Sequence, residues 1–255
     1  MSFREKMEKT AKNKESNVVL NLDFPFEKPE NRQSLYQKAS HVLEVVSPYV
    51  CAVKINHHLV LPLGVFGGVQ KLVKKAYDFG LITIMDCKAN DIGSTNQVIA
   101  EYYYAAGFDA LIANPFVGWE EGLKPIFDVA KRLGRGVILL VYMSHKGASE
   151  GYGQTVFNPE TGEKTLQYVI FAKKASKWGA DGVVVGATYP EKIKEVYQVL
   201  GEKTPIYSPG IGAQGGEIKS ALKAGARYLL VGRAITLAED PAEAAKEIRN
   251  LAMSK

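Results

Sequence analysis

The chain has 255 residues, of which 46% are hydrophobic and 23% charged, and its formal net charge is +5. A chain of this length can bury about three quarters of the surface that it exposes when unfolded, so it can form a core without disulfides. The mild positive charge suits small anionic ligands. The sequence has no long Lys/Arg tract, which argues against a nucleic-acid partner. It also has no apolar run of about 20 residues, which argues against a membrane span.

The N-terminal segment, residues 1–16, is polar and highly charged and contains no apolar core. It does not have the pattern of a secretory signal, and we expect a frayed or surface helix before the first strand. The two cysteines, Cys51 and Cys87, stand alone in apolar runs without CxxC spacing. We expect both to be reduced, buried thiols, which is typical of a cytoplasmic protein.

Eight short runs rich in β-branched residues follow this segment, and we predict that each is a strand. The runs are nearly continuously apolar, as expected of strands that are covered on both faces. In chain order they are Val18–Asp23, Cys51–Asn56, Leu81–Asp86, Phe108–Asn114, Gly136–Tyr142, Gly182–Gly186, Pro205–Ser208 and Tyr228–Gly232.

Longer amphipathic segments separate these runs, and several end at a glycine, as helix C-termini commonly do. The predicted helices are Ser34–Val46, Val65–Phe79, Asn96–Ala106, Glu120–Leu133, Thr165–Trp178, Glu191–Leu200, Gly216–Ala224 and Pro241–Leu251. The longest stretch with neither pattern is Ser144–Lys164, rich in Gly, Ser and Asn. We expect it to be an irregular loop that is functional or mobile.

Strict alternation of strands and helices predicts a parallel sheet. Eight units in about 250 residues favour an α/β fold of the (β/α)8 TIM-barrel type over an open doubly wound sheet. In addition, the first strand is not followed by the GxGxxG turn that is typical of a nucleotide-binding doubly wound sheet. The sequence contains no linker. We therefore expect a short N-terminal helical extension over residues 1–16 and a single barrel over residues 17–255.

Charged residues gather where the predicted strands end, which is where active sites lie in such barrels. Lys54 lies within the second strand, and Asp86 and Lys88 lie at the end of the third. Because side chains alternate along a strand, Asp86 and Lys88 should point one way and Cys87 the other. Buried charges need partners of opposite sign, so these residues, with Asp91 nearby, predict an array of alternating charges rather than an isolated surface ion pair.

A second group of polar residues follows the seventh and eighth strands. The glycine-rich run 209–216 contains Gln214, and Gly232-Arg233 ends the last strand. Glycine N–H groups can approach phosphate oxygens, Gln214 can donate its amide, and Arg233 offers a planar pair of donors. Because barrels often bind phosphate after strands 7 and 8, this position predicts a phosphate site.

The four histidines, His41, His57, His58 and His145, show no metal-ligand spacing such as HxH or HExxH. His57 and His58 are adjacent, so on an extended segment they would face opposite sides. We predict a site without a metal ion or a cofactor.

At these residues the chain closely resembles orotidine 5′-phosphate decarboxylase of the archaeal type, over about residues 17 to 250. The central motif is Asp86-x-Lys88-x-x-Asp91-Ile92-x-x-Thr95, which by itself is shared with related enzymes. Together with five supporting motifs it is specific. These are Leu22-Asp23, Val53-Lys54-Ile55, Met143-Ser144-His145, Pro209-Gly210-Ile211-Gly212-Ala213-Gln214-Gly215-Gly216 and Val231-Gly232-Arg233.

The resemblance implies decarboxylation of orotidine 5′-monophosphate to uridine 5′-monophosphate, the last step of pyrimidine nucleotide synthesis. It implies that Lys88 protonates C6 of the pyrimidine and that Asp86 lies beside the leaving carboxylate. Asp91, with Ile92 and Thr95, would come from the partner subunit of a homodimer and complete the charge array.

The remaining implied roles are those of substrate binding. Lys54 and Asp23 would hold the ribose hydroxyls together with Thr95, and Ser144 would contact the pyrimidine. Gln214, Arg233 and the N–H of Gly232 would hold the phosphate. The implied substrate contacts are Asp23, Lys54, Ile92, Thr95, Ser144, Pro209, Gly210, Ile211, Gln214, Gly232 and Arg233.

The chain departs from the family pattern in two places. The segment before Asn17 has no counterpart in compact members, and the stretch after the fifth strand is long. Two alternatives also remain. One is a Mg²⁺-dependent 3-hexulose-6-phosphate synthase or keto-gulonate-phosphate decarboxylase, which shares the Asp-x-Lys-x-x-Asp core. The other is a barrel that binds a phosphorylated ligand without catalysis.

Overall fold

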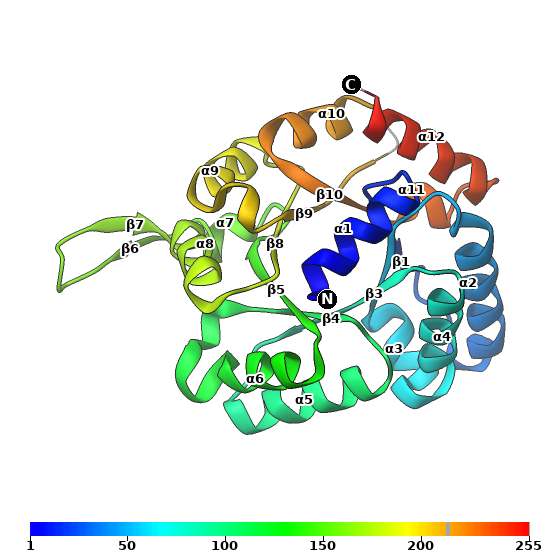
Figure 1. The fold of residues 1–255 in the computed structure, drawn as a ribbon, viewed down its shortest axis with the longest axis horizontal. Coiled ribbons are helices and arrows are strands. Elements are labelled where there is room, and N and C mark those ends of the chain that lie inside the picture. Colours follow the sequence, from blue (N-terminus) through cyan, green and yellow to red (C-terminus); the bar gives the residue numbers. More distant parts are fainter. Residues whose placement is uncertain (213–214, 255) are drawn as a thin grey trace.

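The computed structural model describes residues 1–212 and 215–254. Its central sheet is a closed barrel of eight strands, neighbours pairing in the order β1-β10-β9-β8-β5-β4-β3-β2, and every pair in it is parallel. The predicted (β/α)8 barrel is confirmed (Figure 1). The strands are β1 (Val18–Leu22), β2 (Ala52–Asn56), β3 (Ile82–Ala89), β4 (Ala110–Ala113), β5 (Gly136–Tyr142), β8 (Gly182–Val185), β9 (Ile206–Pro209) and β10 (Ala226–Val231).

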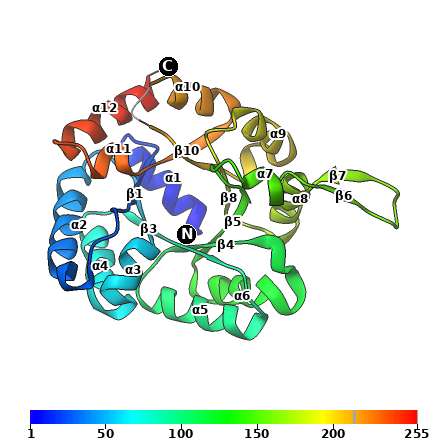
Figure 2. The same cartoon turned by 180° about the vertical axis from the view of Figure 1, so that it is seen from behind.

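Helices surround this barrel and cover its outer face (Figures 1 and 2). Their buried apolar side chains and those of the strands form one continuous core. The long helices are α2 (Arg32–Val46), α4 (Gln70–Asp78), α5 (Gly93–Ala105), α6 (Lys124–Leu133), α8 (Gln167–Trp178), α9 (Pro190–Leu200), α10 (Gly215–Ala224) and α12 (Pro241–Met253), and the short ones are α3 (His57–Leu63), α7 (Ala148–Gly151) and α11 (Arg233–Thr236).

The prediction of one helix over Val65–Phe79 was wrong at its start. Helix α3 already begins at His57, and the kinked segment Gly64–Val69, with non-helical dihedral angles at Gly67, separates it from α4. His57 and His58 therefore open a helix and do not lie on an extended segment. The Asn56 side chain caps this helix by accepting a hydrogen bond from the His58 N–H.

The N-terminal segment forms α1 (Phe3–Asn13), which is capped by Ser2 and Glu5 and is not frayed. Phe3 and Met7, one turn apart on one face, are buried. In Figure 1 the helix crosses the opening of the barrel. It contacts the N-terminal ends of the strands, because the Arg4 guanidinium donates to the carbonyl oxygens of Ala180 and Lys203.

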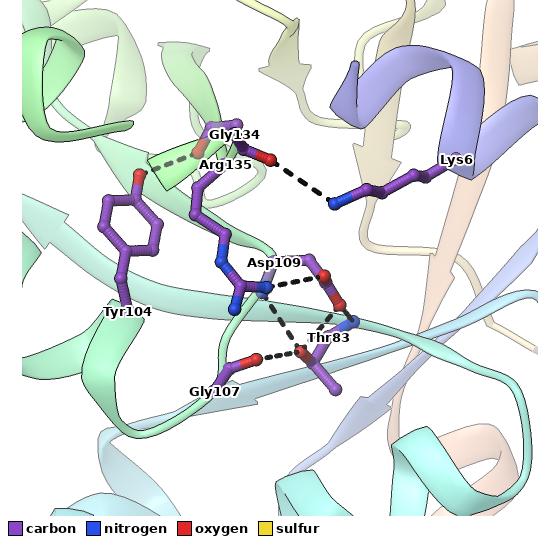
Figure 3. Close-up of polar contacts among 8 residues, drawn as sticks. Lys6, Thr83, Tyr104, Gly107, Asp109, Gly134 and Arg135 are labelled. Atoms are coloured by element: carbon purple, nitrogen blue, oxygen red, sulfur yellow. Dashed lines mark hydrogen bonds and ion pairs between the residues drawn. The ribbon is translucent and has the colours of Figure 1, made fainter. Parts of the chain in front are cut away.

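Residues at the N-terminal end of the barrel are joined by hydrogen bonds and an ion pair. The Asp109 carboxylate accepts a hydrogen bond from the Thr83 hydroxyl at 3.1 Å and pairs with Arg135 at 2.9 Å, and Lys6 of α1 donates to the Gly134 carbonyl oxygen (Figure 3). These contacts tie α1 and the loops before β4 and β5 together, at the end of the barrel away from the charged residues Asp86 and Lys88.

The expectation that Ser144–Lys164 is an irregular loop was only partly right. After α7, strands β6 (Thr155–Phe157) and β7 (Lys164–Leu166) form an antiparallel hairpin. The hairpin projects from the barrel beside α8 (Figures 1 and 2). Three-residue strands are too short for the alternating pattern that identifies a strand in a sequence. Among the described residues, no helix has the length and apolar character needed to cross a membrane.

Candidate active site

Lys54, Asp86 and Lys88 form a charged group inside the C-terminal end of the barrel. Lys54 of β2 pairs with one oxygen of the Asp86 carboxylate, and the Lys88 ammonium lies 2.7 Å from the other oxygen. The side chains of Lys54 and Asp86 are 4% and 8% exposed, whereas that of Lys88 is 37% exposed. The predicted convergence of Lys54, Asp86 and Lys88 is therefore observed, and Lys88 is the member that can reach a ligand in the mouth of the barrel.

The two ammonium groups determine the charge of Asp86. Burial alone raises the pKa of this carboxyl, but the charges of Lys54 and Lys88 and their hydrogen bonds outweigh burial and lower the pKa to about 2. Asp86 is therefore a carboxylate at neutral pH, and it places a fixed negative charge beside Lys88.

Lys88 has an unusual backbone conformation, with a φ of +49°. The register between β3 and β4 shifts between Met85 and Ala89, so Lys88 lies in an irregular part of the strand. A left-handed conformation is costly for a residue with a side chain, and such strain is concentrated at functional sites. Cys87 faces β4 instead, where its thiol donates to the Ile112 carbonyl oxygen and burial raises its pKa to about 12.

Asp91, Ile92 and Thr95 are not brought to this group within the single chain. All three are exposed on the loop after β3 and on the first turn of α5, and Ile92 is 62% exposed. The Asp91 carboxylate accepts a hydrogen bond from the Ile92 N–H at 2.7 Å. Among the residues that the structure describes, no ion pair joins Asp91 to Lys54 or Lys88.

A cavity of about 390 Å³ opens at the ends of β1, β9 and β10. It brings together the predicted residues Asp23, Ser144, Gly232 and Arg233, whereas Lys54 and Thr95 are not among its lining residues. Gln214 lies outside the described residues. The cavity is lined by Asn21, Asp23, Ser144, Pro209, Gly210, Ile211, Gly212, Leu230, Gly232, Arg233 and Ala234.

Glycines let the backbone approach the polar side chains of this cavity. A Cβ on Gly232 would lie 2.6 Å from Oδ1 of Asp23, and one on Gly186 would lie 2.6 Å from the Cα of Ser144. Gly210 has a φ of +90° and would place a Cβ 3.0 Å from that of Ser144. A residue larger than glycine at any of these positions would therefore collide with Asp23 or Ser144.

Two buried acceptors lie beside the cavity. The Oδ1 atoms of Asn21 and Asp23 are buried and have no hydrogen-bond partner within the described part of the chain. An unpaired buried acceptor is costly, which is the pattern expected where a ligand supplies the donor. Sequence reasoning missed Asn21, which lies two residues before Asp23 near the end of β1 and also lines the cavity.

Two further residues of the site region carried no sequence signal. Thr188 follows β8, and its hydroxyl would lie 3.2 Å from a Cβ on Gly210. Glu217 of α10 accepts a hydrogen bond from the Gly212 N–H at 2.8 Å, so its carboxylate lies at the loop where the phosphate is expected.

Residues 16–248 match the family model described as orotidine 5′-phosphate decarboxylase / HUMPS family. The chain belongs to this family. It is 39% identical to orotidine 5′-phosphate decarboxylase of Pyrococcus furiosus over 212 residues, which cover 83% of this chain and 90% of the relative. The members of this family named orotidine 5′-phosphate decarboxylase are carboxy-lyases.

Two solved structures of orotidine 5′-phosphate decarboxylases show the same fold. That from Pyrococcus horikoshii superposes with a TM-score of 0.75 at 34% identity and covers 93% of this chain and 100% of its own. That from Methanocaldococcus jannaschii, solved with the inhibitor BMP, superposes with a TM-score of 0.74 at 29% identity and covers 93% of this chain and 98% of its own. The resemblance found in the motifs is thus confirmed across the barrel.

Proposed function

We propose that this chain decarboxylates orotidine 5′-monophosphate to uridine 5′-monophosphate and CO2, the last step of pyrimidine nucleotide synthesis, without a metal ion or a cofactor. The observation that carries the proposal is the position of Asp86 between two ammonium groups, at the same end of the barrel as a cavity lined by Asp23, Ser144 and Arg233. The membership of the family and the names of its archaeal relatives support the same reaction.

Lys88 is the proposed proton donor. When the bond between C6 and the carboxylate breaks, the electron pair stays on C6 in the plane of the ring, where no π system can delocalise it. The Lys88 ammonium stabilises this developing charge and then transfers a proton to C6, leaving an amine that is protonated again from water. The barrier must fall by on the order of 20 kcal/mol, so a preorganised charge is needed.

Asp86 supports this step in two ways. Its carboxylate holds the Lys88 ammonium at 2.7 Å, and it places a negative charge where the substrate carboxylate is proposed to lie. The like charges disfavour the bound substrate more than the transition state, from which the carboxylate leaves as neutral CO2.

The cavity binds the rest of the nucleotide in this proposal. Asp23, with Lys54, receives the ribose hydroxyls, which supply a donor to the unpaired Oδ1 of Asp23. Ser144 contacts the pyrimidine. The phosphate is held by Arg233, Gln214 and the Gly232 N–H, with Pro209, Gly210 and Ile211 lining the cavity. Binding energy from the phosphate, which does not react, can be used to assemble the site.

The active form is proposed to be a homodimer in which Asp91, Ile92 and Thr95 complete the partner's site. An exposed apolar row on and beside α5 supports this, because Ile92, Val98 and Tyr102 are 62%, 52% and 58% exposed. Phe66, which is 54% exposed, packs edge-on against Tyr102 with ring centroids 5.9 Å apart and extends the row. Exposed apolar patches of this kind are typical of protein interfaces.

The test is to treat the purified protein with a chelator, add orotidine 5′-monophosphate and follow the loss of its ultraviolet absorbance. We expect rapid conversion to uridine 5′-monophosphate. If the folded protein does not convert the nucleotide but turns over a sugar phosphate in the presence of Mg²⁺, it is instead a 3-hexulose-6-phosphate synthase or a keto-gulonate-phosphate decarboxylase. Binding of the nucleotide without turnover in either assay would leave a binding protein.

Two variants then test the roles within the site. Lys88→Ala should abolish turnover but still bind uridine 5′-monophosphate. Asp91→Ala subunits mixed with Lys88→Ala subunits should regain activity, because one of the two sites in a mixed dimer then contains both residues. If subunits exchange and activity does not return, the shared site is wrong.

A further inference from the structure

The loop that carries Asp91 is held by a buried amide. Asn96, in the first turns of α5, is 0% exposed, and its Nδ2 donates hydrogen bonds to the carbonyl oxygen of Asp91 at 2.5 Å and to that of Gly122 at 3.0 Å. The side chain therefore connects the loop after β3 with the segment that precedes α6. Neither Asn96 nor this segment has a part in the reaction described above.

The segment on the other side of this bridge is strained. Residues Trp119–Leu123 form a kinked turn in which Glu121 has a φ of +52°. This turn packs closely against the loop, because a Cβ on Gly93 would lie 3.1 Å from the carbonyl carbon and oxygen of Glu121. Strain of this kind persists only where the surroundings fix the conformation.

A second hydrogen bond fixes the loop from its other end. The side-chain oxygen of Asn90 accepts a hydrogen bond from the Val117 N–H at 3.1 Å. Asp91 thus lies between two residues that are both tied to the segment 117–122. Its backbone is held although its side chain is exposed.

The chemistry of the bridge requires an amide at position 96. Two carbonyl oxygens face the same side-chain nitrogen, and an NH2 group offers one N–H to each. A carboxylate has the same shape, but it cannot donate and would place its lone pairs against both oxygens. An apolar side chain would leave both carbonyl oxygens without these donors.

We infer that Asn96 is a positioning residue, which fixes Asp91 in the orientation needed to complete the charge array of the partner subunit. The inference rests on the proposed function, in which Asp91 acts across the dimer. It has a distinctive consequence. Replacing Asn96 should damage the site in the partner subunit and leave the site of its own subunit intact.

The experiment uses mixed dimers, prepared by co-expressing two differently tagged chains, with Lys88→Ala silencing one of the two sites. In a dimer of wild type with Lys88→Ala, the working site receives Asp91 from the Lys88→Ala subunit, and we expect about half of the wild-type activity.

The variant Asn96→Asp is then placed in either subunit. When Asn96→Asp is in the same chain as Lys88→Ala, it disturbs the Asp91 that the working site uses. We then expect kcat to fall about tenfold or more, as is typical when a residue that orients a functional group is lost. In the opposite chain it disturbs only the Asp91 that serves the silenced site, and activity should stay near that of the reference dimer.

A second variant and a control separate positioning from folding. If a carboxylate at position 96 prevents folding, Gly93→Ala serves instead, because its Cβ presses on the same turn without burying a charge, and the same dependence on the subunit is expected. Thr83→Val removes a buried hydroxyl at the far end of the barrel (Figure 3) and should lower thermal stability without any dependence on the subunit.

The outcomes distinguish the two proposals. Equal losses of activity with Asn96→Asp in either subunit, or no loss in both, would overturn the positioning role while Asp91→Ala and Lys88→Ala still complement each other. Failure of that complementation would instead contradict the shared site on which the inference rests.

Discussion

Lys54 and Asp86 form an ion pair that joins two neighbouring barrel strands and is shielded from water on both sides, with side chains 4% and 8% exposed. The register of β2 with β3 brings the two residues together, because Asn56 lies opposite Asp86 and Lys54 lies two residues earlier. The second oxygen of Asp86 holds Lys88. The charge that organises the proposed proton donor is thus itself held by a buried lysine.

Asp86→Asn should lower the free energy of unfolding by about 3–5 kcal/mol, because it leaves the buried Lys54 ammonium without a counter-charge. The double variant Lys54→Met/Asp86→Leu should regain most of this stability while remaining inactive. Urea unfolding measures both. The exposed pair of Lys74 with Asp78 is the control, and Asp78→Asn should cost less than about 1 kcal/mol. A double variant no more stable than Asp86→Asn would contradict the role of the unpaired charge.

The stability of the protein should depend on the ionisation of Asp86 in acid. Burial raises the pKa of this group, but Lys54 and Lys88 bring it down to about 2, below the value of about 3.9 in an unfolded chain. Because the folded state holds the proton less tightly, the contribution of Asp86 is fully present above about pH 4 and is lost as the pH falls through about 2. Urea unfolding between pH 5 and pH 2 should show a smaller loss of stability for Asp86→Asn than for the wild type.

Arg233→Ala should weaken the binding of uridine 5′-monophosphate but not that of uridine. A hydrogen bond to a charged group contributes about 1.5–3 kcal/mol, so the dissociation constant should rise about 10- to 100-fold. Calorimetric titration with both ligands measures the difference. Arg227→Ala is the matched control, since Arg227 pairs with Glu8 of α1 away from the cavity. An equal loss of affinity for uridine would show that Arg233 does not act through the phosphate.

Val98→Glu should convert the protein to monomers with little activity, because it places a charge in the exposed apolar row proposed as the dimer interface. Sedimentation at several concentrations gives the oligomeric state, and the absorbance assay gives the activity of the same samples. Lys74→Glu, on the exposed face of α4, should change neither. Fully active monomers of Val98→Glu would rule out a site shared between subunits.

Phe3→Ala should lower the free energy of unfolding by about 3–5 kcal/mol without changing kcat or KM at temperatures where the protein stays folded. The Phe3 ring is buried against Gly136, where a Cβ would lie 2.4 Å from it, at the end of the barrel away from the charged site. Thermal unfolding and kinetics measure the two effects separately. Tyr77→Ala, at a side chain 78% exposed, should change stability by no more than about 0.5 kcal/mol. A loss of kcat in Phe3→Ala would mean that α1 influences the site.

The sequence by itself determined the barrel and most of the residues at its mouth. Strand runs and helical periods are local patterns, and the rule that parallel strands carry their sites at their C-terminal ends then brings Asp23, Lys54, Asp86 and Ser144 to one end of the molecule. The packing of α1 against the barrel was not predicted, because two apolar residues in a charged segment, Phe3 and Met7, give a weak signal.

Only the tertiary structure decided how these residues are held. Which lysine pairs with which oxygen of Asp86 depends on the register between strands, and Lys88 takes its left-handed conformation where the register between β3 and β4 shifts. The bridge from Asn96 to Gly122 joins residues 26 positions apart. Such contacts form between segments distant in the chain, and their geometry is set by the packing of the whole barrel rather than by local preference.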